Sequence, residues 1–168
     1  EVRRILYFAA VAGAATHGPL DTATSYGTMI FWPFTDARIA WDILPIIDPV
    51  FTLTVTGLLI ASLVRKWKTS GYYLLGFWAV FFGLGIIQNL RVSSALNQVA
   101  DLRGHQMERH RVMAMPASLL VWNSVYEYEG RLYRDSFRPG DFTGVRWSGG
   151  NTVPLVTIAD LPESLKQN

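Results

Sequence analysis

His17 and Asp21 are the two residues whose types and spacing most clearly suggest chemistry. They lie four positions apart, a separation that places two side chains on one face of a helix. An imidazole nitrogen and a carboxylate oxygen on one face can hold a divalent metal ion together, and zinc accepts both kinds of ligand. The spacing therefore suggests a metal site, with a histidine satisfied by a backbone carbonyl as the alternative interpretation.

Pro19 lies between these two residues and affects how closely they can pair. Proline lacks the backbone donor that continues a helix, so a helix can break there. If Gly18 ends one helix and Pro19 begins another, the pair becomes looser. Hydroxyl side chains that could orient metal ligands surround the pair at Thr16, Thr22, Thr24 and Ser25.

Three further aspartates follow, at Asp36, Asp42 and Asp48. Asp36 can cap a helix that follows it and pair with Arg38, and Asp42 can face water. Asp48 directly precedes a proline at the start of an apolar run, so it is either an N-cap or a metal ligand. The predicted metal site therefore consists of His17, Asp21 and Asp48.

His105 and His110 suggest a second metal site, which their surroundings disfavour. A spacing of five places them on different faces of a helix. Three neighbouring arginines would also repel a cation, namely Arg103, Arg109 and Arg111. A basic surface that contacts lipid headgroups is the better interpretation.

The elements that would position these residues begin with two apolar runs, residues 46–64 and 72–90. The first has one charge, the second has none, and each approaches the roughly 20 residues that cross a bilayer as a helix. The basic and aromatic stretch 65–68 separates them, so we expect a helical hairpin. The apolar run 5–16 is too short to cross alone, and we expect it to end a third helix that begins upstream of a truncated N-terminus.

The pattern changes after residue 90. Residues 91–113 have a helical period with one apolar face, which predicts that the preceding helix continues out of the membrane. Residues 118–137 alternate around a turn at Gly130, which predicts a β-hairpin. The stretch from Pro139 onward is rich in Gly and Pro, which predicts turns with one short strand at 153–158. The expected fold is a mainly α integral membrane protein with two to three transmembrane helices and a small C-terminal β-hairpin region. Its expected parts are 1–113, with a polar loop at 17–45, and the β-containing extramembrane tail 114–168.

The amino-acid composition limits the kinds of metal site and binding partner that the chain can have. The 168 residues include no cysteine, which excludes disulfides and thiolate metal sites. The balance of 15 basic and 13 acidic residues argues against nucleic acid and leaves membrane lipid as the expected partner. The positive-inside rule places the basic stretch 65–68 in the cytoplasm and the polar loop outside, although several arginines after residue 90 count against this orientation.

Two stretches carry a resemblance to a known family: HGPLDTATSYGT at 17–28 and FWPFTDARIAWDILPIIDPVFTL at 31–53. In these, and more loosely in RVMAMPASLLVWNSV at 111–125, the chain resembles the membrane-bound metal-dependent hydrolases of the YdjM inner-membrane type. The resemblance implies a protein of the bacterial inner membrane, with a surface metal site that includes His17 and Asp21. The family also has an upstream histidine-rich element, which this chain lacks. Because a catalytic zinc takes three protein ligands and a water, the site is incomplete here.

The leading hypothesis is therefore a metal-dependent hydrolase at the bilayer surface, acting on an ester or phosphoester of a small-molecule or lipid-like substrate. The alternative is a non-catalytic membrane protein whose polar loop and tail bind a partner. A small transporter ranks last, because no charge lies in the middle of an apolar run and two or three helices make a thin path. The sequence leaves the substrate and the oligomeric state open.

Overall fold

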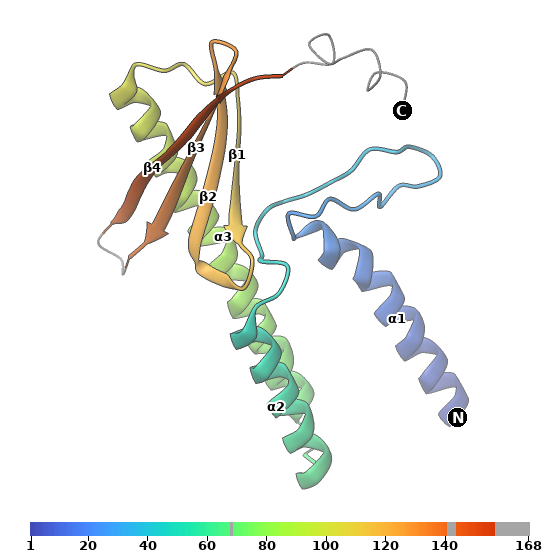
Figure 1. The fold of residues 1–168 in the computed structure, drawn as a ribbon. Coiled ribbons are helices and arrows are strands. Elements are labelled where there is room, and N and C mark those ends of the chain that lie inside the picture. The colour runs from blue at the N-terminus through green and yellow to red at the C-terminus, as the bar shows by residue number, and fades with distance from the viewer. Residues whose placement is uncertain (68, 141–143, 157–168) are drawn as a thin grey trace.

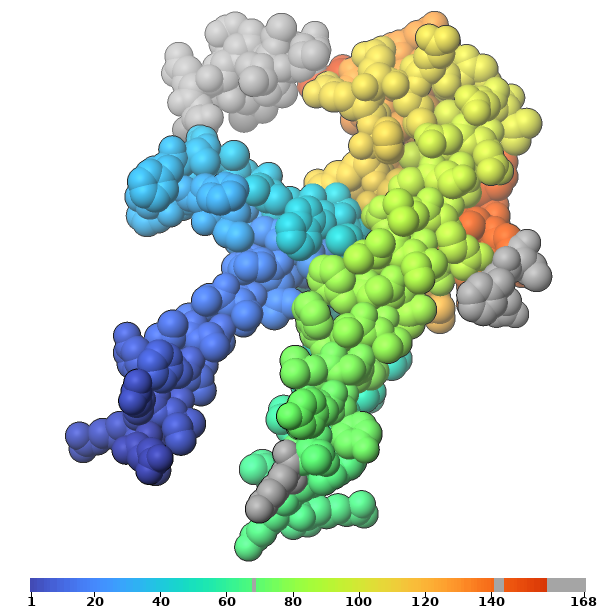
Figure 2. Space-filling model, turned by 180° about the vertical axis from the view of Figure 1, so that it is seen from behind, coloured from blue at the N-terminus to red at the C-terminus, as the bar shows by residue number. Residues whose placement is uncertain are grey.

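The structure is a computed structural model that describes residues 1–67, 69–140 and 144–156. Helices α1 (Val2–Thr22), α2 (Pro49–Arg65) and α3 (Ser70–Arg103) are followed by strands β1 (Arg109–Met115), β2 (Ser118–Tyr128), β3 (Arg131–Pro139) and β4 (Val145–Pro154). In Figure 1, α2 runs beside the first half of α3, the sheet lies against its second half, and α1 diverges from both. Figure 2 shows α1 and the α2–α3 pair as two arms with a hollow between them.

The ends of α2 and α3 follow from their capping residues. The Asp48 side chain accepts a hydrogen bond from the Phe51 backbone N–H, and Pro49 takes the first helical position, where its missing donor costs nothing. Helix α2 therefore has 17 residues and leaves Ile46 and Ile47 outside. Helix α3 ends at Gly104, whose left-handed φ of 72° is the conformation that glycine adopts most readily.

The four strands form one antiparallel sheet in the order β1-β2-β3-β4. The β2–β3 turn falls at Glu129 and Gly130, which both have positive φ, so the predicted turn position is confirmed. Strand β4 contains Gly150 where the register slips, and a Cβ there would collide with the backbone oxygen of Arg134. The glycines of this segment therefore permit close strand pairing at an irregular point of the sheet.

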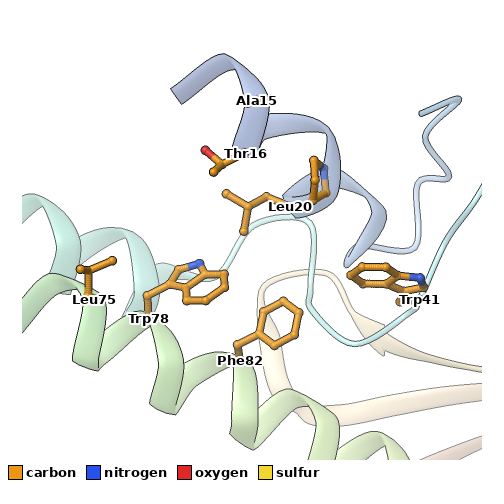
Figure 3. Close-up of a pocket in the computed structure, with 8 residues that line it drawn as sticks. Ala15, Thr16, Leu20, Trp41, Leu75, Trp78 and Phe82 are labelled. Atoms are coloured by element: carbon orange, nitrogen blue, oxygen red, sulfur yellow. The ribbon is translucent and has the colours of Figure 1, made fainter. Parts of the chain in front are cut away.

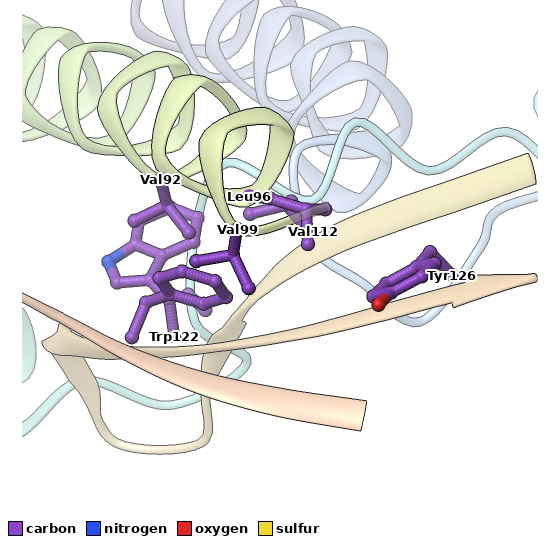
Figure 4. Packing of buried hydrophobic residues seen from close by; sticks show 8 residues of the cluster. Val92, Leu96, Val99, Val112, Trp122 and Tyr126 are labelled. Carbon is purple, nitrogen blue, oxygen red and sulfur yellow. The ribbon is translucent and has the colours of Figure 1, made fainter. Parts of the chain in front are cut away.

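The hydrophobic core lies between the second half of α3 and one face of the sheet (Figure 4). Val92, Leu96 and Val99 recur at helical spacing and point toward the sheet. Trp122 and Phe137 meet them from neighbouring strands and are almost fully buried. The helical extension predicted beyond residue 90 is confirmed as far as Arg103, and its apolar face forms the core against the sheet.

The predicted fold class is wrong. The described residues form three helices and a four-stranded antiparallel sheet, so the chain is not a mainly α membrane protein with a small β-hairpin. Strand β1 begins within the stretch 91–113 that is predicted to be helical, because the helix ends at Arg103, before Gly104. Strand β4 lies mostly in a stretch predicted to be turns. Of the predicted strand at 153–158, residues 153 and 154 are the end of β4, residues 155 and 156 are not in a strand, and residues 157 and 158 lie outside the described residues.

Among the described residues, α3 is the one helix both long enough and apolar enough to cross a membrane. Helix α2 is apolar but shorter, because its caps exclude the two isoleucines before it. The first half of α3 exposes large apolar side chains such as Tyr72, Leu75 and Val80. The expectation of two to three transmembrane helices is therefore corrected to one helix that meets the length and composition needed.

Candidate functional site

His17 and Asp21 share one exposed face near the end of α1. The helix continues through Pro19 to Thr22, so the proline does not separate the two side chains. His17 Nδ1 lies 3.2 Å from Asp21 Oδ2, and the side chains are 75% and 47% exposed. The structure thus brings these two predicted residues together in a place that water and solutes can reach.

The distance between these two atoms suits joint binding of a metal. Two ligand atoms about 2.0–2.2 Å from a tetrahedral zinc lie about 3.4 Å from each other. The pair therefore fits two of the ligand positions. No group of three or more potential ligands of the His, Asp and Glu types is found within the described ranges, so these residues alone do not complete a site.

Asp48 caps α2 instead of facing this pair directly. Its Oδ1 accepts the Phe51 N–H at 3.0 Å, and the residue is 8% exposed. It lines a cavity of about 310 Å³ together with Leu20 and Thr24, which flank Asp21 in the sequence. Its predicted role as a third metal ligand stays a prediction, while its role as the N-cap is visible in the structure.

Asp42 is held by a long-range ion pair. Arg111 of β1 donates to both carboxylate oxygens of Asp42, at 2.7 and 2.8 Å. Asn89 of α3 donates to the Asp42 backbone oxygen, and Asp42 is only 7% exposed. The expectation that Asp42 faces water is wrong, because this residue ties the loop after α1 to both the sheet and α3.

Asp36 lies in an exposed part of the same loop, and no helix follows it before α2. The expectation that it caps a helix is therefore wrong. Its expected partner Arg38 donates instead to the backbone oxygen of Gly27, at 3.2 Å. This contact joins the two sides of the loop, which also pair at Thr28 and Ile39.

An apolar cavity of about 440 Å³ lies beside the His17–Asp21 turn, between α1 and α3 (Figure 3). Leu20 of α1, Trp78 and Phe82 of α3, and Trp41 of the loop surround one space. Thr16, the neighbour of His17, also lines it. An apolar groove therefore lies next to the polar side chains of His17 and Asp21. This arrangement suits a ligand with one apolar and one polar part.

His105 lies in an aromatic cluster and not in a metal site. Its ring stacks on Tyr128 with centroids 4.3 Å apart, and its Nδ1 lies 2.9 Å from Tyr126 Oη. Tyr126 also accepts a hydrogen bond from Arg103, whose guanidinium forms a two-pronged ion pair with Asp135. Burial raises the pKa of the Tyr126 phenol above its usual value.

Comparison with known protein families identifies the family to which the chain belongs. Residues 2–92 match the family described as YdjM inner membrane protein. The chain belongs to the YdjM inner membrane protein family. The matched region of this YdjM protein contains His17, Asp21, Asp42 and Asp48 and ends before the sheet. No curated protein and no solved structure matched the chain.

Sequence reasoning missed the partner that holds Asp42 in this YdjM protein. Arg111 was interpreted as part of a basic surface, whereas it anchors the loop from 69 positions away. The charge of Asp42 and the basic residues at 109–111 were both visible in the sequence. Neither of these two features predicts that Asp42 and Arg111, which are 69 positions apart, form an ion pair.

Proposed function

We propose that this YdjM family protein is a metal-dependent hydrolase at the surface of the inner membrane, in which His17 and Asp21 hold a divalent ion such as zinc. The observation that carries the proposal is the pair itself, with a ligand-type nitrogen and oxygen 3.2 Å apart on one exposed helix face. Both residues lie in the region that matches the family.

The proposal places α3 across the membrane, with the pair near the outer surface. The start of α1 and the end of α2 lie at the same end of the molecule (Figure 1), so Arg3, Arg4, Arg65 and Lys66 gather there. Such a basic end suits the cytoplasmic face. At the opposite end, the arginines that counted against this orientation include Arg103, Arg109 and Arg111, and each is paired with a carboxylate.

In the proposed site, His17 and Asp21 orient the ion, and the rest of the substrate lies in the groove beside Leu20, Trp78 and Phe82. A divalent ion there supplies Lewis acidity and lowers the pKa of a water nucleophile. The apolar groove favours an ester or phosphoester that carries an apolar group. A third ligand is still needed. Asp48 is the candidate from the sequence, and it lines a cavity together with Leu20 and Thr24 while its Oδ1 caps α2.

The test is turnover of bis(p-nitrophenyl) phosphate, and of an acyl p-nitrophenyl ester, by detergent-purified protein with and without added zinc. We expect zinc-dependent turnover that falls by at least the roughly 10–100-fold seen for disturbed metal sites in His17→Ala and Asp21→Ala. Matched controls are His110→Ala and Asp36→Ala, since both residues are exposed and neither forms the ion pair that joins His17 and Asp21. Turnover of both substrates that is equal in all four variants would contradict the proposal.

The second candidate is a non-catalytic membrane protein that binds a partner. An exposed aromatic segment in the loop after α1 favours it, with Phe31, Trp32 and Phe34 exposed to 56%, 70% and 93%. Contiguous exposed aromatic side chains are typical of interaction surfaces. This candidate predicts no bound metal, together with a cross-linked complex in native membranes that Trp32→Ser abolishes and His17→Ala preserves.

A further inference from the structure

The loop after α1 exposes an aromatic segment, residues 29–34. Its three large rings, Phe31, Trp32 and Phe34, are each more than half exposed. No charge occurs between Asp21 and Asp36, so the segment lies within a stretch of the loop that has no ionised side chain. Rings of this size are stabilised when an apolar phase covers them.

Backbone hydrogen bonds hold the segment in this exposed arrangement. The Phe34 N–H donates to the Phe31 oxygen at 2.9 Å, and the two sides of the loop exchange hydrogen bonds between Thr28 and Ile39. The ion pair described above ties the base of the loop to the sheet. An ordered turn therefore presents the three rings to the surroundings.

The aromatic segment begins beside the last turns of α1. Ile30 approaches α1 at Gly18, where an added Cβ would lie 3.6 Å from Ile30 Cγ1. Leu20 of α1 shares a cavity with Trp78 of α3 (Figure 3), and Trp78 belongs to the uncharged run 72–90. The end of α1 and the start of the segment therefore lie alongside the part of α3 that is proposed to enter the membrane.

We propose that the aromatic segment inserts into the interfacial region of the bilayer, with Phe31, Trp32 and Phe34 as its anchors. Aromatic rings gather at this boundary because their apolar body and a polar edge, such as the indole N–H, both find suitable surroundings there. The loop projects outward from the end of α1, away from α2 and α3, which leaves the segment free to reach lipid (Figure 1). The inference rests on the proposed placement of α3 in the membrane and is independent of any hydrolytic activity.

Lipid is favoured over a protein as the occupant of this surface. Within residues 29–34, the Trp32 indole N–H is the one side-chain group that can form a conventional hydrogen bond. Protein interfaces surround their aromatic anchors with a polar rim that forms hydrogen bonds, whereas the bilayer interface needs no such rim. A protein on this segment, which the second candidate function requires, is the competing outcome of the test.

The test is site-directed spin labelling, which is direct because the chain has no cysteine. The full chain with Phe34→Cys, Val80→Cys or Glu129→Cys carries a nitroxide label and is reconstituted into vesicles of phosphatidylcholine and phosphatidylglycerol. Power saturation compares collisions with oxygen, which partitions into lipid, and with a water-soluble nickel chelate. We expect the Phe34→Cys label to favour oxygen, as the Val80→Cys label in the uncharged run does, and the Glu129→Cys label in the exposed β2–β3 turn to favour nickel.

A double substitution tests whether the rings themselves drive the insertion. Addition of Phe31→Ser and Trp32→Ser to the Phe34→Cys protein should shift its label toward the nickel chelate. Leu102→Ser is the matched control, because Leu102 is an exposed apolar residue in the last turn of α3. This control should leave the label unchanged.

Three results would overturn the inference. If the Phe34→Cys label favours nickel while the Val80→Cys label favours oxygen, the segment lies in water and α3 keeps its place. If the Phe34→Cys label meets nickel in vesicles but is shielded from both reagents in native membranes, a protein covers the segment. If the Val80→Cys label itself favours nickel, the placement of α3 and the inference fail together.

Discussion

Asp21 differs from Asp42 and Asp48 in the number of hydrogen bonds that its carboxylate already accepts from the rest of the protein. Asp42 is buried and bound at both oxygens by Arg111, and Asp48 caps α2. Asp21 is exposed and contacts His17, whose ring is also open to solvent. Of these three acids, Asp21 is therefore the one that can gain an external ligand at the least cost in structure.

Removal of Arg111 should loosen the loop after α1. Arg111→Ala leaves the Asp42 carboxylate buried without its partner, and an unsatisfied buried group costs about 1–3 kcal/mol. We expect faster hydrogen exchange in residues 23–45, with little change in the sheet core around Trp122. The matched control is Arg134→Ala, an exposed arginine without a described ion pair. Unchanged exchange in the loop would show that this ion pair does not hold it.

Two substitutions at Asp48 separate capping from metal binding. Asp48→Ala should destabilise α2 by about 1 kcal/mol, whereas asparagine is itself a good N-cap and Asp48→Asn should be nearly neutral. Thermal unfolding in detergent measures both. Loss of bound metal in Asp48→Asn at unchanged stability would assign Asp48 to the metal site; retained metal would leave it as a cap only.

Tyr126 should make the sheet and its core sensitive to alkali. Burial is the main cause that raises the pKa of its phenol in the folded state. The neutral phenol is thus favoured by folding, so its contribution is complete below the unfolded pKa of about 10 and is lost as pH rises through the native value. Absorbance titration of tyrosinate should show a late-titrating group that disappears in Tyr126→Phe. A titration curve unchanged by that substitution would contradict this.

For single residues, the sequence predicted that His17 and Asp21 lie together, but it did not predict the long-range contacts of the other charged residues. The spacing of His17 and Asp21 predicted a shared face, and the geometry has it. The contacts Asp42–Arg111 and Arg103–Asp135 join residues far apart in the chain, and local pattern does not encode such pairings. The same holds for His105, whose aromatic neighbours come from two strands.

Helix α3 is the element that joins the two halves of the molecule. Its first half exposes apolar side chains, and its second half buries Val92 and Leu96 against the sheet. One continuous helix therefore fixes the position of the sheet relative to the apolar first half of α3. This explains why the uncharged run and the amphipathic pattern follow each other without a break in the sequence.

The two halves of α3 should respond differently to the same substitution. Leu96→Ala opens a cavity in the core and should lower the free energy of unfolding by about 2–5 kcal/mol. Leu84→Ala, at a side chain that is 47% exposed, should change stability in detergent much less. Chemical denaturation followed by tryptophan fluorescence compares them. Equal effects would contradict the assignment of the core to the second half of α3.

The elements that sequence patterns predicted best were those with strong local signals. Long apolar runs gave α2 and the first half of α3, and the Glu129–Gly130 turn was visible from its residues. Strand β1 was missed because its sequence, three basic residues followed by four apolar ones, shows no alternation of polar and apolar residues and directly follows a helical pattern. Strand β4 was missed because Gly149 and Gly150 suggest turns, whereas here they allow two strands to approach closely.

At the scale of the whole molecule, the structure combines an apolar lower part with a polar upper part. Figures 1 and 2 show the helical arms extending from the loop and sheet. His17 and Asp21 lie in the last turns of α1, where that helix leads into the loop. The chain belongs to an inner-membrane family, and the function proposed for the His17–Asp21 site places the boundary between these parts at the lipid surface.

The most direct test of the proposed metal site is elemental analysis of detergent-purified protein after dialysis against trace zinc. We predict bound zinc in the unmodified protein, lost in His17→Ala and in Asp21→Ala and retained in His110→Ala. A zinc content that is the same in all four proteins, or that is absent from the unmodified one, would contradict a metal site at His17 and Asp21.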